Sequence, residues 1–225
     1  MLGECGCDIG GAEFHLVDLG CGCGRVASFL AGLTRRGRYS GFDVWHEGIA
    51  WAQRHISPAA PWMIFRALSG EPLGYEGRRA FALPLAPASV DAVAAVSLFT
   101  HLDRAATRFY LAEIGRVLKP GGFVYMTAFL RDADTAPLLR ARHHRDFVHV
   151  EEGGVSFFAR GGYLDSCLDR DFLEREMARC GLEPAHLRYG SWRGPHLSTV
   201  NAAAYQDLVV ARRAGGLDSR AAVPL

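Results

Sequence analysis

Leu16-Val-Asp-Leu-Gly-Cys-Gly-Cys-Gly-Arg25 is the stretch that decides the fold of this chain. The largely apolar run at 14–19 stops at glycines 20, 22 and 24, and residues 25–33 continue with apolar side chains at helical spacing. This order predicts a strand, a tight turn and a helix. Such a turn presents backbone N–H groups at the start of a helix, where they can approach a nucleotide-like ligand.

The acidic residue Asp18 distinguishes between two kinds of ligand for this turn. A carboxylate beside Gly20 and Gly22 would repel a diphosphate. It would instead attract the ammonium or sulfonium group of an aminoacyl nucleoside. The loop therefore predicts S-adenosylmethionine (SAM) as the ligand.

A second carboxylate, Asp43, follows at the separation expected of a ribose ligand. Tyr39-Ser-Gly-Phe-Asp-Val44 has the pattern of a short strand that ends about 20 residues past the glycine loop. One carboxylate can accept hydrogen bonds from both ribose hydroxyls. The alternative is that Asp43 caps the helix expected at 47–56.

Length and composition limit the class of protein. The 225 residues, 49% hydrophobic and 22% charged, suit one folded α/β domain. The net charge of +1 gives no electrostatic reason to expect a nucleic acid or an anionic membrane as partner. No apolar run approaches the ~20 residues of a membrane-spanning helix, and residues 1–8 lack the pattern of a signal peptide. We expect a cytoplasmic location, and the oligomeric state stays open.

The cysteines are expected to be free thiols rather than metal ligands. The six include two C-x-C pairs, and this is not the C-x₂-C spacing typical of zinc ribbons. Disulfides are disfavoured in a reducing cytosol. Metal binding at the pairs is the alternative. The cysteines are Cys5, Cys7, Cys21, Cys23, Cys167 and Cys180.

The remaining pattern alternates between strands and helices. Further strands are expected at 62–66, 89–97 and 123–130, helices at 104–118 and 171–181, and an antiparallel pair at 187–189 and 205–212. Lys119-Pro-Gly-Gly122 is expected to end its helix. These elements predict an α/β fold with a doubly wound, Rossmann-like seven-stranded sheet, mostly parallel with an antiparallel C-terminal strand. Residues 1–214 would form one domain, with an insertion at 131–170 capping the substrate site and a flexible tail at 215–225.

Together these segments resemble a class I SAM-dependent methyltransferase over residues 14–130. The resemblance rests on residues 17–25, Gly41-Phe-Asp-Val44, Leu83-Pro-Leu85 with Ser89-Val-Asp91, and Glu113-Ile-Gly-Arg-Val-Leu-Lys-Pro-Gly-Gly122. A narrower resemblance, to a bacterial type 11/12-like methyltransferase group, extends through residues 41–49, Ser97-Leu-Phe-Thr-His-Leu102, Gly190-Ser-Trp192 and Tyr205-Gln-Asp207.

The resemblance implies roles for individual residues around SAM. The methionine end would be held by Asp18 and the loop, the ribose by Asp43 and the adenine by packing on Val44, with two residues after the fourth strand under the cofactor. The implied cofactor-binding residues are Asp18, Gly20, Cys21, Gly22, Asp43, Val44, Ser97 and Leu98. Many members have an Asp after the third strand for the adenine amino group, and residues 67–70 have none.

His101 is the candidate general base, because it follows the fourth strand and has a suitable intrinsic pKa. The alternative is a structural histidine at the start of the next helix. Three further histidines could contact the substrate or could form a solvated basic face. Two aromatic residues could line an acceptor pocket, and Trp192 could instead belong to the core. These residues are His143, His144, His149, Tyr163 and Trp192.

Methyl transfer to a small-molecule oxygen, in a sugar or secondary metabolite, is the favoured function. No Asn-Pro-Pro-Tyr motif of nitrogen methylation is present. A non-catalytic SAM-binding protein and an NAD-dependent oxidoreductase are the alternatives. The glycine loop with Asp43 would suit a dinucleotide, whereas Asp18 and the Leu-Lys-Pro-Gly-Gly segment disfavour it.

Overall fold

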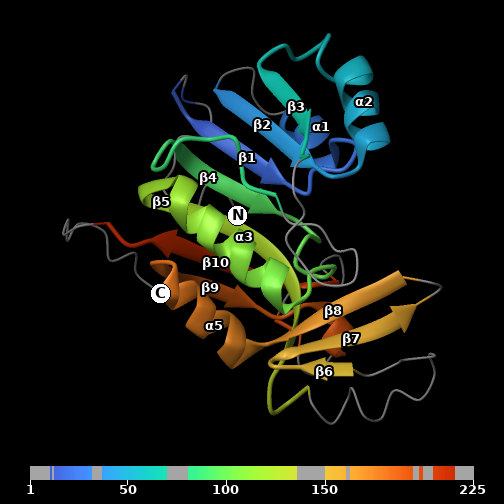
Figure 1. Ribbon diagram of the computed structural model, residues 1–225, viewed down its shortest axis with the longest axis vertical. Helices are drawn as coiled ribbons and strands as arrows, with labels where there is room; N and C mark the ends of the chain where they lie inside the picture. The colour runs from blue at the N-terminus through green and yellow to red at the C-terminus, as the bar shows by residue number, and fades with distance from the viewer. Residues whose placement is uncertain are drawn as a thin grey trace.

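The computed structural model describes residues 11, 13–31, 37–69, 81–135, 150–160, 163–194, 198–199 and 205–215. Figure 1 shows a twisted sheet with helices on both faces. The first strands are β1 (His15–Leu19), β2 (Arg38–Asp43), β3 (Met63–Ala67), β4 (Val90–Ala95) and β5 (Leu118–Arg131). The others are β6 (Val150–Glu152), β7 (Val155–Arg160), β8 (Tyr163–Asp169), β9 (Leu182–Arg188) and β10 (Asp207–Arg213). The helices are α1 (Arg25–Ala31), α2 (His46–His55), α3 (Arg104–Val117), α5 (Arg170–Arg179) and the short 3₁₀ helix η2 (Ser191–Arg193).

Seven of these strands form the predicted sheet. Their order is β3-β2-β1-β4-β5-β10-β9, and the pairs from β3 to β5 are parallel, whereas β10 is antiparallel to both β5 and β9. This confirms the doubly wound fold and the antiparallel C-terminal strand. Strands β2 and β3 are added on one side of β1, and β4 and β5 on the other, so the strand order reverses between β1 and β4. In such sheets ligands bind at the carboxyl ends of the strands beside that reversal.

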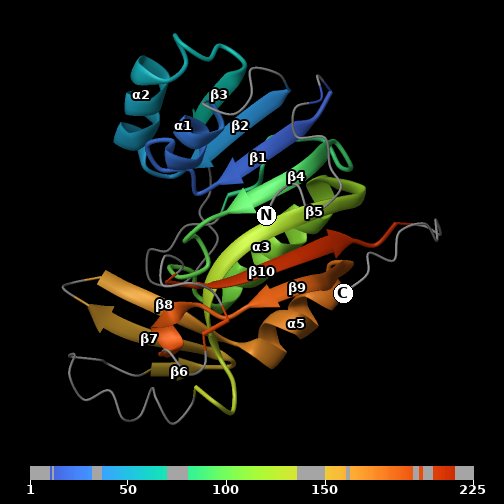
Figure 2. The same ribbon diagram turned by 180° about the vertical axis from the view of Figure 1, so that it is seen from behind.

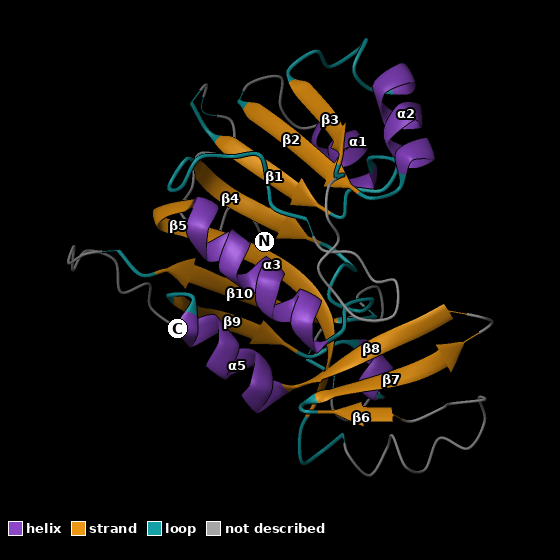
Figure 3. Cartoon of the chain, in the orientation of Figure 1, coloured by secondary structure: helices purple, strands orange, loops and turns teal. Residues whose placement is uncertain are grey.

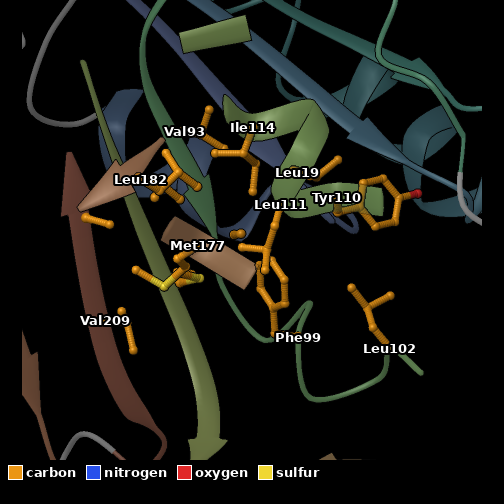
Figure 4. Packing of buried hydrophobic residues seen from close by; sticks show 14 of the residues in the cluster. Leu19, Val93, Phe99, Leu102, Tyr110, Leu111, Ile114, Met177, Leu182 and Val209 are labelled. Atoms are coloured by element: carbon orange, nitrogen blue, oxygen red, sulfur yellow. The ribbon is translucent and has the colours of Figure 1, made fainter. Parts of the chain in front are cut away.

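Two hydrophobic cores pack against opposite faces of the sheet. Alternate residues of each central strand face one core or the other, as in β1, where Val17 and Leu19 join one cluster and Leu16 the other. The first core lies under α3 and α5, and the second under α1 and α2. Figures 2 and 3 show these helices on the two sides of the sheet, and Figure 4 shows Leu111 and Ile114 of α3 packed near Met177 of α5.

The segment Lys119-Pro-Gly-Gly122 ends α3 as predicted, but the structure includes it in β5. The strand pairs Val90 with Leu118 and then Ala92 with Phe123, so several residues of β5 bulge out opposite one residue of β4. Gly121 has a φ of +78°, a value that favours glycine. The segment expected only to end the helix is therefore also a bulge within a continuous strand.

The insertion after β5 adds three strands to the sheet. The last residues of β5 pair in parallel with β8, as in Phe129 with Cys167 and Arg131 with Asp169, and β7 and β6 follow as antiparallel neighbours. Figure 1 shows these strands projecting beyond the seven-stranded sheet. The predicted histidines 143, 144 and 149 and the tail from residue 216 lie outside the described residues.

Among the described residues, no helix combines the length and the apolar character needed to cross a membrane.

Candidate cofactor and acceptor site

A cavity of about 430 Å³ opens at the carboxyl ends of β1, β2 and β4. This volume falls within the range of small-molecule sites. Its position is the one expected from the reversal of strand order between β1 and β4. The cavity is lined by Leu19, Gly20, Phe42, Asp43, Val44, Leu68, Ser97, Leu98, His101, Leu102 and Tyr110.

The glycine loop is hydrogen-bonded to the neighbouring strand β2. The backbone N–H groups of Gly20 and Cys21 both donate to the Phe42 carbonyl, at 2.8 and 3.1 Å. Gly20 has a φ of +77°, and a Cβ there would lie 3.2 Å from the Leu98 side chain. A larger residue would therefore strain the backbone and crowd Leu98 at the edge of the cavity.

Asp43 ties the glycine loop to the start of α2. Its Oδ2 accepts a hydrogen bond from Gly22 N at 2.7 Å, and its Oδ1 accepts one from Trp45 N at 2.8 Å. Each carboxylate oxygen can accept about two hydrogen bonds, so Asp43 retains capacity for two further donors. Asp43 is not the N-cap of α2, which is Trp45, so the helix-capping alternative is wrong, and the spare acceptor capacity of Asp43 is compatible with the expected ligand role.

The Trp45 ring packs against the first turn of α2, just after Asp43. A Cβ at Gly48 would lie 2.3 Å from a carbon of that ring, so the glycine allows the indole to pack directly on the first turn of α2. Val44 lies between Asp43 and Trp45 and lines the cavity with a side chain that is 47% exposed. An apolar side chain left exposed beside Asp43 is suited to contact a flat, weakly polar ring.

Asp18 lies behind the cavity rather than in its wall. Its carboxylate is buried, and its Oδ2 accepts a hydrogen bond of 2.5 Å from the Tyr39 hydroxyl of β2. Burial raises the pKa of Asp18 to about 6, and the hydrogen bond from Tyr39 offsets part of this effect. A buried carboxylate beside the glycine loop, when ionised, attracts a cation to the loop, although its desolvation by burial costs folding free energy.

The Asp18→Asn variant is expected to be more stable than the wild type above pH 6 in the absence of ligand. In the folded protein the pKa of Asp18 is raised above its ordinary value of 3.8. The wild type therefore has its full free energy of unfolding below about pH 4 and loses the contribution of Asp18 as the pH rises through about 6. The loss is about 3 kcal/mol, and asparagine avoids it while still accepting the Tyr39 hydrogen bond. Urea unfolding of both proteins from pH 4 to 8 measures the difference. Asp134→Asn, on an exposed turn, is the control, and parallel curves for Asp18→Asn and wild type would contradict the assignment.

The loop after β4 is held by a cluster of hydroxyl and amide groups. Ser97 has a φ of +61°, rare for a residue other than glycine, and its N–H donates to Thr127 Oγ1 at 2.8 Å. The hydroxyls of Ser97 and Thr127 both donate to Gln206 Oε1, at 3.0 and 2.5 Å. No role was expected for Thr127, although a polar residue near the end of the apolar strand β5 is a signal for one, and Gln206 was expected only as part of the motif at 205–207.

His101 lies in the same loop and lines the cavity. Its backbone N–H donates to the Leu98 carbonyl at 2.9 Å, while its side chain remains 56% exposed. Its Nδ1 lies 3.5 Å from Oδ1 of Asp165, in strand β8 of the insertion. The backbone therefore serves the turn before α3, and the imidazole is left available at the cavity.

A buried ion network lies beneath the insertion side of the site. Arg193, 2% exposed, donates to Asp207 Oδ1 at 3.0 Å, to Asp132 Oδ2 at 2.8 Å and to the Leu130 carbonyl at 2.8 Å. Asp207 also accepts from Gly190 N at 2.8 Å, which joins the two C-terminal motifs singled out in the sequence. These motifs hold the ends of β5 and β10 together beside Gln206.

The structure brings most of the predicted site residues to one cavity. Its wall includes Gly20, Asp43, Val44, Ser97, Leu98 and His101. Asp18 lies behind the loop, and Cys21 and Gly22 belong to the loop without lining the cavity. Trp192 is buried edge-to-face against Phe129, with ring centroids 5.3 Å apart. Sequence reasoning missed Leu68 and Tyr110, which also line the cavity.

Comparison with known proteins places this site in a family. Residues 17–126, which include the glycine loop, Asp43 and His101, match the model of the methyltransferase domain. Nearly half of the chain therefore matches the methyltransferase-domain family, and the fold is that of a solved SAM-dependent methyltransferase. SAM is the cofactor of this family, which decides against the dinucleotide alternative.

The chain is also similar to several curated and solved proteins. It is 32% identical to a malonyl-[acyl-carrier protein] O-methyltransferase of Methylovorus sp. over 71% of this chain and 53% of that protein. It is 31% identical to the O-methyltransferase resE of Aspergillus sclerotiorum over 59% of this chain and 47% of that protein. The chain spans about half the length of these curated relatives. A SAM-dependent methyltransferase of Methanosarcina mazei has the same fold, with a TM-score of 0.65 and 17% identity over 92% of this chain and 95% of that one.

The cavity fits SAM, the cofactor of the family that residues 17–126 match. It offers a carboxylate with spare acceptor capacity at Asp43, apolar walls at Val44 and Leu68, and a glycine at position 20 whose Cβ would crowd the edge of the cavity. The absence of an Asp after β3 leaves the adenine edge to other groups. Leu68, whose N–H donates to the Asp43 carbonyl at 2.8 Å, occupies that position.

Proposed function

We propose that the protein transfers the methyl group of SAM to a hydroxyl oxygen of a small-molecule acceptor. The observation that carries the proposal is that His101 lines the same cavity as the residues suited to hold the cofactor. Two similar curated proteins are named as O-methyltransferases, which favours oxygen over other acceptor atoms.

In this proposal the donor side of the cavity holds the cofactor. Asp43 would accept hydrogen bonds from the ribose hydroxyls, Val44 and Leu68 would pack on the adenine, and the loop at 20–22 with Asp18 behind it would hold the methionine end. Ser97 and Leu98 would lie under the cofactor. When bound, SAM supplies an electrophilic methyl group, and the electron pair of the broken bond stays on sulfur in S-adenosylhomocysteine.

The acceptor side holds the nucleophile and its proton. His101 would accept the proton of the acceptor hydroxyl at an imidazole nitrogen and later release it to solvent. We propose that the insertion at 131–170 forms the wall on this side, which is supported by the contact between Asp165 of β8 and His101. Alignment of the acceptor oxygen with the methyl group would supply the rest of the rate enhancement.

The proposal is tested by binding and by product formation. Calorimetric titration of the purified protein with SAM and S-adenosylhomocysteine should give saturable binding, and NADH fluorescence should be unaffected by the protein. Incubation with methyl-labelled SAM and a pool of sugars and phenols should then yield labelled methyl ethers. Absence of binding would refute the proposal, and binding without labelled product would favour a non-catalytic SAM-binding protein.

A further inference from the structure

The insertion contributes a carboxylate to the histidine of the cavity. Asp165 Oδ1 lies 3.5 Å from His101 Nδ1, and the two side chains are 24% and 56% exposed. This separation is longer than a strong hydrogen bond, but catalytic hydrogen bonds are often long in ligand-free structures and shorten in the substrate complex.

Backbone contacts fix the two residues relative to each other. Ser166, which follows Asp165, donates its backbone N–H to the carbonyl of Thr100, which precedes His101, at 2.6 Å. Ser166 and Thr100 are almost fully buried. Thr100 and Ser166 therefore have little freedom to separate, and they keep the neighbouring His101 and Asp165 close to each other.

The base of the insertion is also packed against the helices of the first core. A Cβ at Gly153 would lie 2.9 Å from the Arg104 guanidinium of α3, and one at Gly154 would lie 2.7 Å from Phe172 of α5. Asp169, at the end of β8, pairs with Arg131 through both carboxylate oxygens. The strand that carries Asp165 is thus paired with β5 on one side, and the turn that leads into its other neighbour, β7, packs against the two helices.

We propose that Asp165 is the positioning residue of His101. A carboxylate facing Nδ1 favours the tautomer in which Nδ1 carries the proton, and this leaves the lone pair of Nε2 free to accept a proton. The same carboxylate stabilises the imidazolium formed when Nε2 takes the proton of the acceptor hydroxyl. The proposal rests on the proposed function for the identity of that hydroxyl, but the pairing itself exists without it.

An exposed ion pair contributes little to folding stability, so stability is not the decisive measurement. The decisive one is the tautomer of His101, read by long-range ¹H–¹⁵N NMR on histidine-labelled protein without cofactor. In the wild type we expect the Nδ1–H form, assigned by its loss in His101→Gln. In Asp165→Ala we expect the Nε2–H form that dominates for free histidine in water, and in the control Asp171→Ala no change. An unchanged His101 tautomer in Asp165→Ala would overturn the proposal.

Kinetics provide the second measurement. Asp165→Ala should lower kcat about 10- to 100-fold with KM for SAM unchanged, and His101→Ala should lower it at least as far. The double variant should be no slower than His101→Ala, and Asp165→Glu should recover part of the rate. Full activity in Asp165→Ala would overturn the positioning role.

The two proposals fail in different ways. If the tautomer responds to Asp165 but no variant or wild type transfers methyl groups, the pairing stands and the proposed function fails. If the wild type forms methyl ethers and Asp165→Ala matches it in both tautomer and rate, the proposed function stands and the positioning role fails. Melting temperatures of the variants, expected to stay near the wild-type value, show that each is folded.

Discussion

Asp43→Ala should weaken SAM binding at least ~100-fold, because charge-assisted hydrogen bonds contribute about 1.5–3 kcal/mol each and two to the ribose are proposed. The variant also loses the acceptor of Gly22 N and Trp45 N, which hold the loop and the start of α2 in place. Calorimetric titration of wild type and variant with SAM measures the change. Asp134→Ala, on an exposed turn away from the cavity, is the matched control.

Ribose recognition can be separated from positioning of the loop. Wild type should bind S-adenosylhomocysteine more tightly than its 2′-deoxy analogue, whereas Asp43→Ala should bind both equally weakly. If the variant still discriminates between them, Asp43 acts on the loop and another group binds the hydroxyl. An unchanged affinity of the variant for SAM would exclude both roles.

Arg193→Met should lower the free energy of unfolding by about 3–5 kcal/mol, the cost typical of removing one partner of a buried ion pair. Burial raises the pKa of Asp207, and the Arg193 guanidinium works against that effect. Without Arg193 the fully buried Asp207 and the nearby Asp132 would lose their shared cation, and the Leu130 carbonyl would lose a donor. Methionine has similar length but supplies neither charge nor hydrogen bonds.

Urea unfolding at pH 7 measures the effect on stability. Arg175→Met, at an exposed position of α5, should change stability by less than about 0.5 kcal/mol. Arg193→Met combined with Asp207→Asn should recover part of the loss, because the buried charge of Asp207 is then removed while a side-chain acceptor for the buried backbone N–H groups is kept. A loss below about 1 kcal/mol in Arg193→Met alone would show that the network is not a major source of stability.

The donor half of the molecule could be predicted from the sequence because its signals are local. β1, the glycine turn and α1 follow one another directly, and Asp43 ends the neighbouring parallel strand, so spacing alone placed them at one edge of the sheet. The same spacing could not show that the Tyr39 hydroxyl donates a hydrogen bond to an oxygen of the Asp18 carboxylate. That contact depends on how two strands pack side by side.

The acceptor half could not be predicted because its contacts join distant segments. The insertion was expected, but its strands were not, since polar residues such as Ser166 occupy buried positions and hide the alternation typical of a strand. Asp165 reaches His101 only because β8 pairs with the end of β5. Gln206 likewise meets Ser97 through the pairing of β10 with β5.

The pairing of β8 with β5 also limits how the molecule can move. Phe129, Leu130 and Arg131 are in register with Cys167, Leu168 and Asp169, so β8 extends the central sheet instead of hanging from it by a hinge. Swinging β8 away to admit a substrate would break this ladder and separate buried side chains. We therefore expect β8 to act as a preformed rigid boundary, with acceptors selected by their fit to it rather than by its closure around them.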